Sequence, residues 1–326
     1  MLIAVNHEGR YVSADQAVGS LFTCPVCQKP VILKKGQYKI AHFSHQRVID
    51  CYQSIYKQES AAHLAGKHEL YRLSQQHHVS MECYIHEIEQ IPDILVDHKS
   101  ALELQLSVIP VETIMARTYG YHSLGISVVW IASETSLKKV DGQLKLTLFQ
   151  RSMIDASRRL LVTFDADTTQ FYCYEIIGLT DRLTLCYRRT CVKSVDDILC
   201  MRTVSPVTQA VTISKAERTK YISSCLGKKS VLEPTLSALY QLGIHWRHLP
   251  KEIGIVVPSQ FYIRTHPIQW QSNLRLLLNK GRFSLPRFAD ELEFYTYYTN
   301  GLTHQTIALQ LINEYRSAVR NLYVQI

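Results

Sequence analysis

The clearest pattern in the sequence is a strict alternation of apolar and polar side chains near residue 100. In the stretch PDILVDHKSALELQLS, residues 92–107, three leucines alternate with three polar residues: Leu102, Leu104 and Leu106 with Glu103, Gln105 and Ser107. This period of two predicts a β-strand over 101–106 whose leucines face a core. A second apolar strand is predicted over 91–96, and the short turn DHKS between them indicates a hairpin.

The segments on either side complete an α/β unit around this hairpin. Helix-forming residues without proline predict a helix over 59–78, and a first strand is predicted over 81–88. VETIMARTYGY predicts a helix after Pro110, and GISVVWIA predicts a buried strand. The order helix, three strands, helix and strand is typical of a small α/β sandwich.

Three regions are predicted along the chain. Residues 1–53 form a small module rich in Cys and His, and residues 54–150 form the central α/β domain. Residues 151–326 form a mostly helical carboxy-terminal region, which begins with a hairpin in RLLVTFDADTTQFYCYEII. The region ends in an amphipathic helix that Thr303 can cap.

The composition narrows the class of protein. The 326 residues are 46% hydrophobic and 20% charged, which is typical of a globular protein with sizeable cores. We find neither a signal peptide nor a run of about 18 uncharged apolar residues, so we expect a cytoplasmic protein without membrane insertion. The formal net charge of +8 favours an anionic partner such as nucleic acid.

The polar row of the strand over 101–106 is a candidate catalytic site. Asp93 lies ten residues before Glu103, and the hairpin can bring the two carboxylates together. Their repulsion is relieved if they share a divalent cation, and hard oxygen ligands suit Mg²⁺ or Mn²⁺. Such an ion activates a water and stabilises the charge that develops on a phosphoryl group. The alternative is that Glu103 and Gln105 lie on a solvated face of the sheet.

The two helices add candidate ligands for metal and phosphate. Glu59, His63 and Lys67 are spaced i, i+4 and i+8, so they line one stripe of the first helix. Glu59 can complete the metal shell, while His63 or Lys67 contacts phosphate. On the next helix Arg117 and Tyr121 are i, i+4 neighbours that suit phosphate contact. The alternative for Glu59, His63 and Lys67 is an ordinary exposed stripe of the helix. The alternative for Arg117 and Tyr121 is packing at the protein surface.

The amino-terminal module carries a candidate zinc site. Cys24 and Cys27 form a CxxC pair, and His42, His45 and Cys51 follow. Two thiolates plus two later ligands satisfy the tetrahedral preference of Zn²⁺, and a small module gains folding energy from the metal. The spacing leaves open which two of the three later residues complete the shell. A redox CxxC or a chance cluster is the alternative.

Two family resemblances follow from these motifs. The pair PD at Pro92 and Asp93, with ExQ at Glu103 and Gln105, resembles the PD-(D/E)xK nuclease superfamily, in which a lysine usually takes the place of Gln105. Over about residues 20–132 the chain resembles the competence protein CoiA family, in the motifs CPVC, HFSH, ESAAHLAGK, PDIL, LELQLS, ARTYGY and VVWIA.

The CoiA resemblance implies an amino-terminal zinc-like region followed by a nuclease-like domain. It also implies a role in natural transformation, in which internalised single-stranded DNA is recombined into the chromosome with a RecA-type recombinase. Carried over by position, the family's nuclease-like residues are Glu59, His63, Lys67, Asp93, Glu103 and Gln105, with Arg117 as support.

Two functional hypotheses therefore stand at the sequence level. The first is a deoxyribonuclease dependent on Mg²⁺ or Mn²⁺ that acts during recombination. The second is a non-catalytic mediator that binds DNA and assists the recombinase, which the missing motif lysine favours. Aromatic residues beside basic ones, as in QFYIRTHPIQW and LYQLGIHWRHLPK, suit stacking on single-stranded DNA or, alternatively, a packed core.

Overall fold

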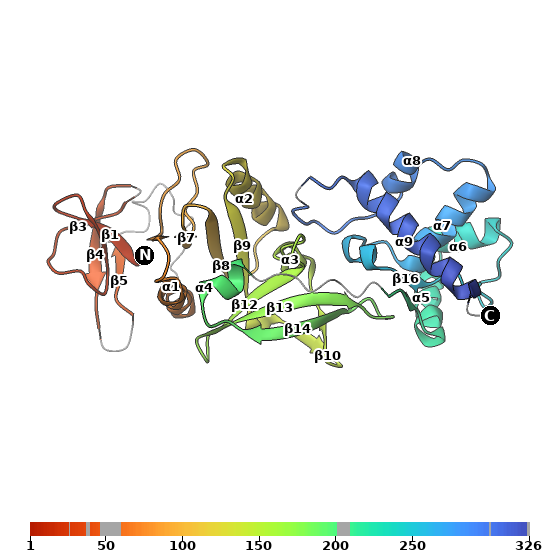
Figure 1. Cartoon of the computed structure of the whole chain (residues 1–326), viewed down its shortest axis with the longest axis horizontal. Helices are drawn as coiled ribbons and strands as arrows, with labels where there is room; N and C mark the ends of the chain where they lie inside the picture. The colour runs from red at the N-terminus through yellow and green to blue at the C-terminus, as the bar shows by residue number, and fades with distance from the viewer. Residues whose placement is uncertain (26, 37–39, 46–59, 201–208, 300, 325–326) are drawn as a thin grey trace.

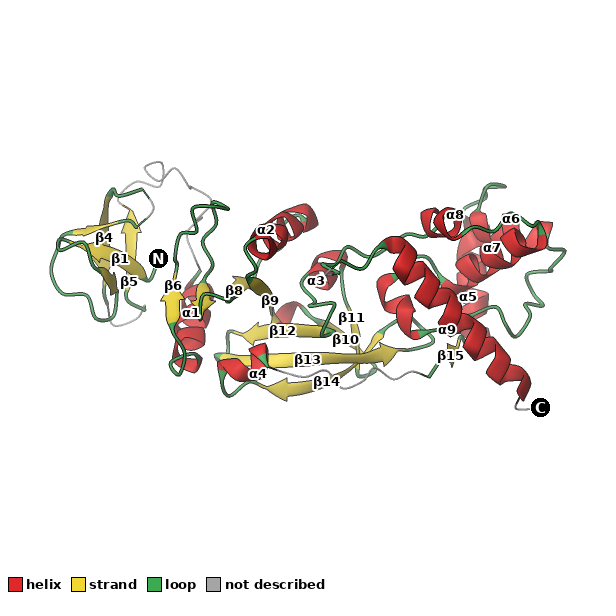
Figure 2. Cartoon of the chain, turned by 45° about the horizontal axis from the view of Figure 1, so that its top comes forward, coloured by secondary structure: helices red, strands yellow, loops and turns green. Residues whose placement is uncertain are grey.

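The structure is a computed structural model, and it describes residues 1–326 except 26, 37–39, 46–59, 201–208, 300 and 325–326. A small module of strands, a large central sheet and a group of helices follow one another along the long axis, in chain order (Figure 1). Figure 2 shows the same succession by secondary structure. Within the residues described, no helix combines the length and the hydropathy that crossing a membrane requires.

The amino-terminal module is a five-stranded antiparallel sheet in the order β2-β1-β3-β4-β5. Its strands are β1 (Ile3–Asn6), β2 (Tyr11–Ser13), β3 (Phe22–Thr23), β4 (Pro30–Lys34) and β5 (His42–His45). The core is small and centres on Phe22 and Phe43, whose ring centroids are 4.9 Å apart. A core of this size supplies little stability by itself, so the module is of the kind that gains from a bound metal.

The central region is a nine-stranded mixed sheet in the order β10-β11-β14-β13-β12-β9-β8-β7-β6. Its first half contains α1 (Ala61–Leu73), β6 (Val79–Met81), β7 (Ile94–Val96), β8 (Ser100–Gln105), α2 (Val111–Ser123) and β9 (Ser127–Ser133). The strands β8 and β9 are parallel, and α2 is the crossover between them. The predicted order of elements is therefore present in this half.

The alternation along β8 sorts its two faces as the sequence indicates. Leu102 and Leu104 pack with Leu70 of α1 in one core cluster, whereas Ala101 packs with Tyr121 of α2 in another. The helices α1 and α2 thus cover opposite faces of the sheet, and the polar side chain of Glu103 lies on the α2 face.

The strand predicted over 81–88 is mostly wrong. The structure has a strand only over Val79–Met81, and the segment from there to β7 is a loop closed by a bridge between Ile85 and Gln90. Glu82 and Glu89 adopt positive φ angles of 49° and 51°, which a continuous strand does not allow. The apolar residues Ile85 and Ile88 of this loop pack against the core cluster of Leu95 and Tyr121 without forming a strand.

The sheet continues past residue 150, where we expected the central domain to end. The elements here are η2 (Glu134–Ser136), β10 (Lys138–Val140), β11 (Gln143–Lys145), α3 (Leu148–Ser152), β12 (Leu160–Asp165), β13 (Gln170–Leu179), β14 (Leu185–Cys191) and α4 (Val195–Leu199). The predicted hairpin is β12–β13, and β12 also pairs in parallel with β9. Since β12 is buried along most of its length, it occupies an interior position.

The carboxy-terminal part is built mainly from helices. Its elements are β15 (Val211–Thr212), α5 (Lys215–Gly227), α6 (Pro234–Gln241), β16 (Ile255–Val256), η3 (Pro258–Tyr262), α7 (Pro267–Asn279), α8 (Leu285–Asp290) and α9 (His304–Val324). Trp270 is buried and donates from Nε1 to Gln260 Oε1 at 2.8 Å. The motif QFYIRTHPIQW is therefore a packed core at this tryptophan, which was one of its two predicted roles.

Candidate functional site

The β7–β8 hairpin places the two predicted carboxylates at neighbouring positions of the sheet. Ile94 pairs with Leu102, so the register continued by one residue sets Asp93 opposite Glu103. The backbone N–H of Leu104 donates to Asp93 Oδ2 at 2.8 Å, which fixes the aspartate at the start of β7. Both side chains are buried, at 7% and 3% exposure, so the solvated-face alternative does not describe Glu103.

Asp93 is held by two basic side chains of α1. The Ser60 side chain caps the helix by accepting from His63 N, which starts α1 at Ala61 and sets His63 in its first turn. His63 Nε2 lies 3.1 Å from Asp93 Oδ2, and Lys67 Nζ lies 3.5 Å from Oδ1. Burial alone would raise the pKa of Asp93, but Lys67 and then His63 lower it well below its ordinary range, so the carboxylate stays ionised.

Lys67 has a second partner, Glu82, which was not among the site residues predicted from the sequence. The Lys67 side chain is fully buried and forms an ion pair with Glu82 Oε1. The other carboxylate oxygen of Glu82 accepts from the backbone N–H of Leu2 at 2.8 Å and of Ile3 at 3.2 Å. Burial raises the pKa of Glu82, while Lys67 and the chain's amino group lower it below its usual value. The ammonium of Lys67 thus lies between two carboxylates, and its predicted alternative as part of an exposed stripe is wrong.

Glu103 is held by two side chains of α2, one turn apart. Arg117 Nη2 and Tyr121 Oη both donate to Glu103 Oε1. Burial raises the pKa of Glu103 to about 7, because the opposing effect of Arg117 does not fully offset desolvation and Asp93 adds repulsion. Tyr121 is fully buried, so surface packing does not describe it. Glu103 is therefore the carboxyl group of the site that changes charge near neutral pH.

Two other predicted site residues, Gln105 and Glu59, are not among the residues that contact Asp93 or Glu103 in the described structure. The amide of Gln105 donates to the Ser107 carbonyl at 2.7 Å and to its hydroxyl at 3.3 Å, so it turns along the chain rather than toward either carboxylate. Glu59 lies outside the described residues, and so does Cys51 of the predicted zinc shell. The structure brings the predicted residues into two neighbouring groups, His63 and Lys67 at Asp93 and Arg117 and Tyr121 at Glu103.

The two acids at the hairpin are of the type that could hold a hard divalent cation. Asp93 and Glu103 supply carboxylate oxygens, and Mg²⁺ is commonly held by one or two carboxylates with water in its remaining positions. Glu103 Oε2 makes no hydrogen bond to any other described residue, so it is the oxygen best placed to turn to an ion. A bound cation would also replace Arg117 and Lys67 as the counter-charge to the two acids.

A second candidate metal site lies in the amino-terminal module. Cys24, Cys27 and His45 place their ligand atoms within 4.8 Å of one another, with Cys27 Sγ 3.3 Å from His45 Nε2. Both cysteines lie between β3 and β4, where the backbone N–H of Gln28 donates to the carbonyl oxygen of Cys24. These three residues can hold a metal ion, since thiolate and imidazole are metal ligands.

His42 does not join this group. It precedes His45 by three positions on β5, and side chains an odd number of residues apart point to opposite faces of a strand. Its Nδ1 instead lies 2.8 Å from the Ile40 carbonyl oxygen. Of the later residues predicted for the shell, His45 is the one that the described structure brings to the cysteines.

Comparison with known proteins covers the two regions that carry these sites. Residues 59–198 match the model of the nuclease-like domain of Competence protein CoiA, and residues 12–54 match the model of its N-terminal domain. Competence protein CoiA of Bacillus subtilis strain 168 is 34% identical over 142 residues, which are 42% of this chain and 38% of that protein. The match thus spans less than half of that relative, and no solved structure is matched. With the two models together covering more than half of the chain, the chain belongs to the competence protein CoiA family.

Proposed function

We propose that this protein is a divalent-metal-dependent DNA nuclease that acts on DNA during recombination in natural transformation. The observation that carries the proposal is the pair Asp93 and Glu103, set opposite each other on β7 and β8 and ringed by basic side chains. Membership of a competence family with a nuclease-like domain supports the setting. We propose that the domain around the pair is a PD-(D/E)xK core and that its substrate is single-stranded DNA in the cytoplasm.

In this proposal the acidic residues hold the ion and the basic residues contact the phosphate. Asp93, ionised at all working pH values, and Glu103 hold the ion, which when bound supplies an activated water and neutralises developing phosphoryl charge. Lys67 lies next to Asp93 and is also paired with Glu82. His63 and Arg117 are the basic groups that reach solvent, with 23% and 28% of their side chains exposed, so they contact the scissile phosphate. Arg117 and Lys67 supply the positive charge that Gln105 lacks.

The proposed metal in the amino-terminal group is Zn²⁺ in a structural role. Two thiolates and an imidazole are the donors that zinc prefers, and Cys51 or a water is the proposed fourth ligand. The CxxC pair lies between two strands rather than at the start of a helix, which favours a metal knuckle over a redox pair.

One observation favours a second candidate function, a non-catalytic mediator that positions a RecA-type recombinase on DNA. Both carboxylates already have cationic or hydroxyl partners, and Gln105 turns away from them. A site satisfied in this way can persist as a DNA-binding platform without metal. The mediator would use the same basic side chains to bind phosphate but would not cut.

Cleavage assays with isosteric variants separate the two candidates. Purified full-length protein is incubated with labelled single- and double-stranded DNA in Mn²⁺, Mg²⁺ or EDTA, alongside Asp93→Asn and Glu103→Gln. Glu175→Gln is the matched control, because Glu175 is a buried acid of the same sheet outside the hairpin. We expect metal-dependent cutting by the wild type and the control, and at least a hundredfold loss in both site variants. Binding of DNA without cutting under any condition would reject the nuclease and support the mediator.

A further inference from the structure

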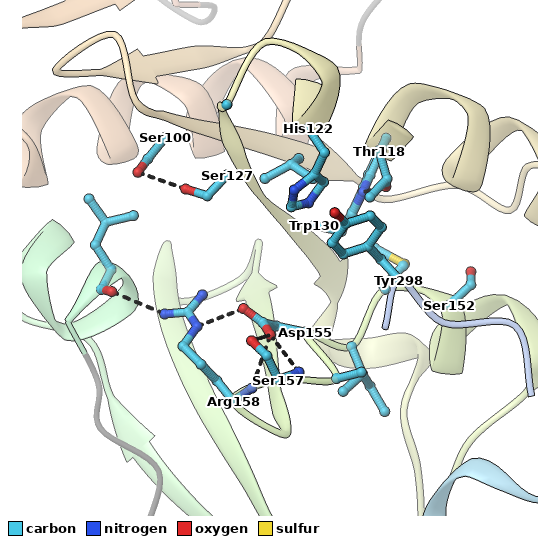
Figure 3. Close-up of a pocket in the computed structure, with 16 residues that line it drawn as sticks. Ser100, Thr118, His122, Ser127, Trp130, Ser152, Asp155, Ser157, Arg158 and Tyr298 are labelled. Atoms are coloured by element: carbon cyan, nitrogen blue, oxygen red, sulfur yellow. Dashed lines mark hydrogen bonds and ion pairs between the residues drawn. The ribbon is translucent and has the colours of Figure 1, made fainter. Parts of the chain in front are cut away.

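A pocket of about 500 Å³ lies beside the candidate site, on the α2 side of the sheet (Figure 3). Its walls come from the start of β9, the end of α2, the loop 153–158 that leads into β12, the end of α4 and Tyr298. The volume is within the range of ligand pockets and is large enough for a nucleoside. None of the predicted site residues lines it, so it is a separate feature of the domain.

One wall of the pocket is aromatic. The rings of His122 and Tyr298 are stacked with centroids 3.6 Å apart and planes 15° apart. Trp130 forms the floor, with its indole N–H donating to Thr118 Oγ1 at 2.9 Å. Burial lowers the pKa of His122, so the imidazole is neutral at physiological pH and offers one donor and one acceptor. His122 lines the pocket with its ring stacked on Tyr298.

The opposite wall is polar and almost neutral in charge. Asp155 accepts from Arg158 Nε at 2.6 Å, and Arg158 Nη1 donates to the carbonyl oxygens of Ile198 and Leu199. Arg158 Nη2 makes no hydrogen bond to the rest of the described chain, and Figure 3 shows it directed into the pocket. The hydroxyls of Ser100 and Ser127, 3.0 Å apart, lie at a third side.

These features select a class of ligand. Because Asp155 cancels the charge of Arg158, the pocket offers a free polyanion no net attraction. A planar, uncharged heterocycle gains from the aromatic wall and can exchange hydrogen bonds with Arg158 Nη2, His122 and the serine hydroxyls. A nucleobase with its sugar has this chemistry.

The pocket also adjoins the carboxylates. Trp130 is the β9 residue paired with Glu103 in the parallel ladder, and the guanidinium of Arg117 lies 5.2 Å from the Trp130 ring centroid. One face of Trp130 thus belongs to the candidate site and another to the pocket. A strand with a phosphate at Arg117 would bring a neighbouring base to the pocket without crossing the sheet.

We propose that this pocket holds one unstacked nucleoside of a single-stranded nucleic acid whose adjacent phosphate lies at Asp93 and Glu103. The proposal rests on the proposed function only in that a strand must reach the carboxylates; it does not require that the strand be cut. An unpaired base costs least to extrude, which favours single strands over duplex. Stacking of one base on aromatic side chains strengthens binding roughly tenfold or more, so the pocket would contribute measurably to affinity.

The test uses zinc-loaded full-length protein without added Mg²⁺ or Mn²⁺, so that cleavage does not interfere. A 12-nucleotide single strand carries the fluorescent base 2-aminopurine at each position in turn, and a parallel series carries one abasic site. We expect the fluorescence to change on binding at a single position only, and the abasic site there to weaken binding roughly tenfold. Ser127→Phe, which fills the pocket, and His122→Ala should both abolish the positional signal. His68→Ala, an exposed histidine of α1, is the control that should leave it intact.

Three outcomes would overturn the proposal, and each is distinct from a failure of the nuclease. A fluorescence change spread over all positions would indicate uniform contact without a base pocket. Retention of the signal in Ser127→Phe would place the base elsewhere. Binding of free deoxynucleoside monophosphate that depends on His122, without a positional signal in the strand, would make the pocket a nucleotide site. If the wild type binds with the positional signal but does not cut in Mn²⁺, the nuclease alone fails.

Discussion

At the scale of single residues, the unusual group is Glu103. Its pKa is raised to about 7 by burial, against 4.5 for an ordinary glutamate, so the folded protein favours its protonated form. A raised pKa contributes stability that is complete below about pH 4.5 and is lost as the pH rises through 7. Asp93, with its lowered pKa, works in the opposite sense and loses its contribution only in strong acid.

We predict that the carboxyl carbon of Glu103 titrates near pH 7 in a carbon-13 NMR experiment, with the signal assigned by its absence in Glu103→Gln. Millimolar Mg²⁺ should lower that pKa, because a cation beside the carboxylate favours the charged form. The control is Glu175, whose signal should not respond to Mg²⁺. An ordinary Glu103 pKa that ignores Mg²⁺ would contradict both the burial argument and the metal site.

The sequence predicted some of the residues at this site but not all of them. Spacing on α1 and α2 indicated His63, Lys67 and Arg117, since i, i+4 neighbours share a helix face. Glu82 was missed because its role depends on the contact with Leu2 and Ile3, eighty residues away along the chain. The inward position of Lys67 goes with its ion pairs to Glu82 and Asp93, so a local helical pattern could not distinguish it from a solvated lysine.

At the scale of elements, the close approach of α1 to the sheet sets where Lys67 and His63 lie. Gly66 permits it: a Cβ at this position would clash with Leu104 Cδ2 and lie 3.2 Å from the ring of Phe164. We predict that Gly66→Ala destabilises the protein by about 1 kcal/mol, since overpacking outweighs the gain in helix propensity. It should also lower activity, because α1 moves from Asp93.

Thermal unfolding and the cleavage assay measure these two effects. Gly227→Ala is the matched control, because Gly227 lies at the end of α5 and an added methyl group there would meet open space. It should keep full activity and stability. Equal behaviour of the two variants would mean that α1 does not need the glycine.

Helices and strands were predicted correctly where burial of one face sets the spacing of apolar residues. They were not where the structure depends on pairing between strands far apart in the sequence. The strand β8 and the helix α2 follow from period-two and helical spacing, and their faces are as expected. The segment between β6 and β7 has the apolar content of a strand, but Ile85 and Ile88, three residues apart, both pack on the same core cluster, which one face of a strand does not allow. The continuation of the sheet into β12 depends on parallel pairing with β9, which the apolar run LLVTF permits but does not specify.

At the scale of the whole molecule, the amino-terminal module and the candidate site are joined through Glu82. Two backbone N–H groups of the β1 segment, at Leu2 and Ile3, hold the carboxylate that in turn pairs with Lys67. If the module loses its order, Glu82 loses these two hydrogen bonds, and the Lys67 ammonium beside Asp93 loses part of its counter-charge. Because the module's core is small, we propose that a metal held by Cys24, Cys27 and His45 stabilises its order.

We predict that the double variant Cys24→Ser, Cys27→Ser loses its bound zinc and the order of the module while the central sheet stays folded. Without β1, Glu82 loses two hydrogen bonds and gains water, which weakens its hold on Lys67. Hydrogen exchange should become fast at Leu2 and Ile3 and remain slow in β8 and β9, and metal-dependent cutting should fall at least tenfold. Cys83→Ser, outside the metal group, is the control and should change none of these. Unchanged zinc in the double variant would reject the metal group, and lost zinc with full activity would show that the link through Glu82 does not reach Asp93.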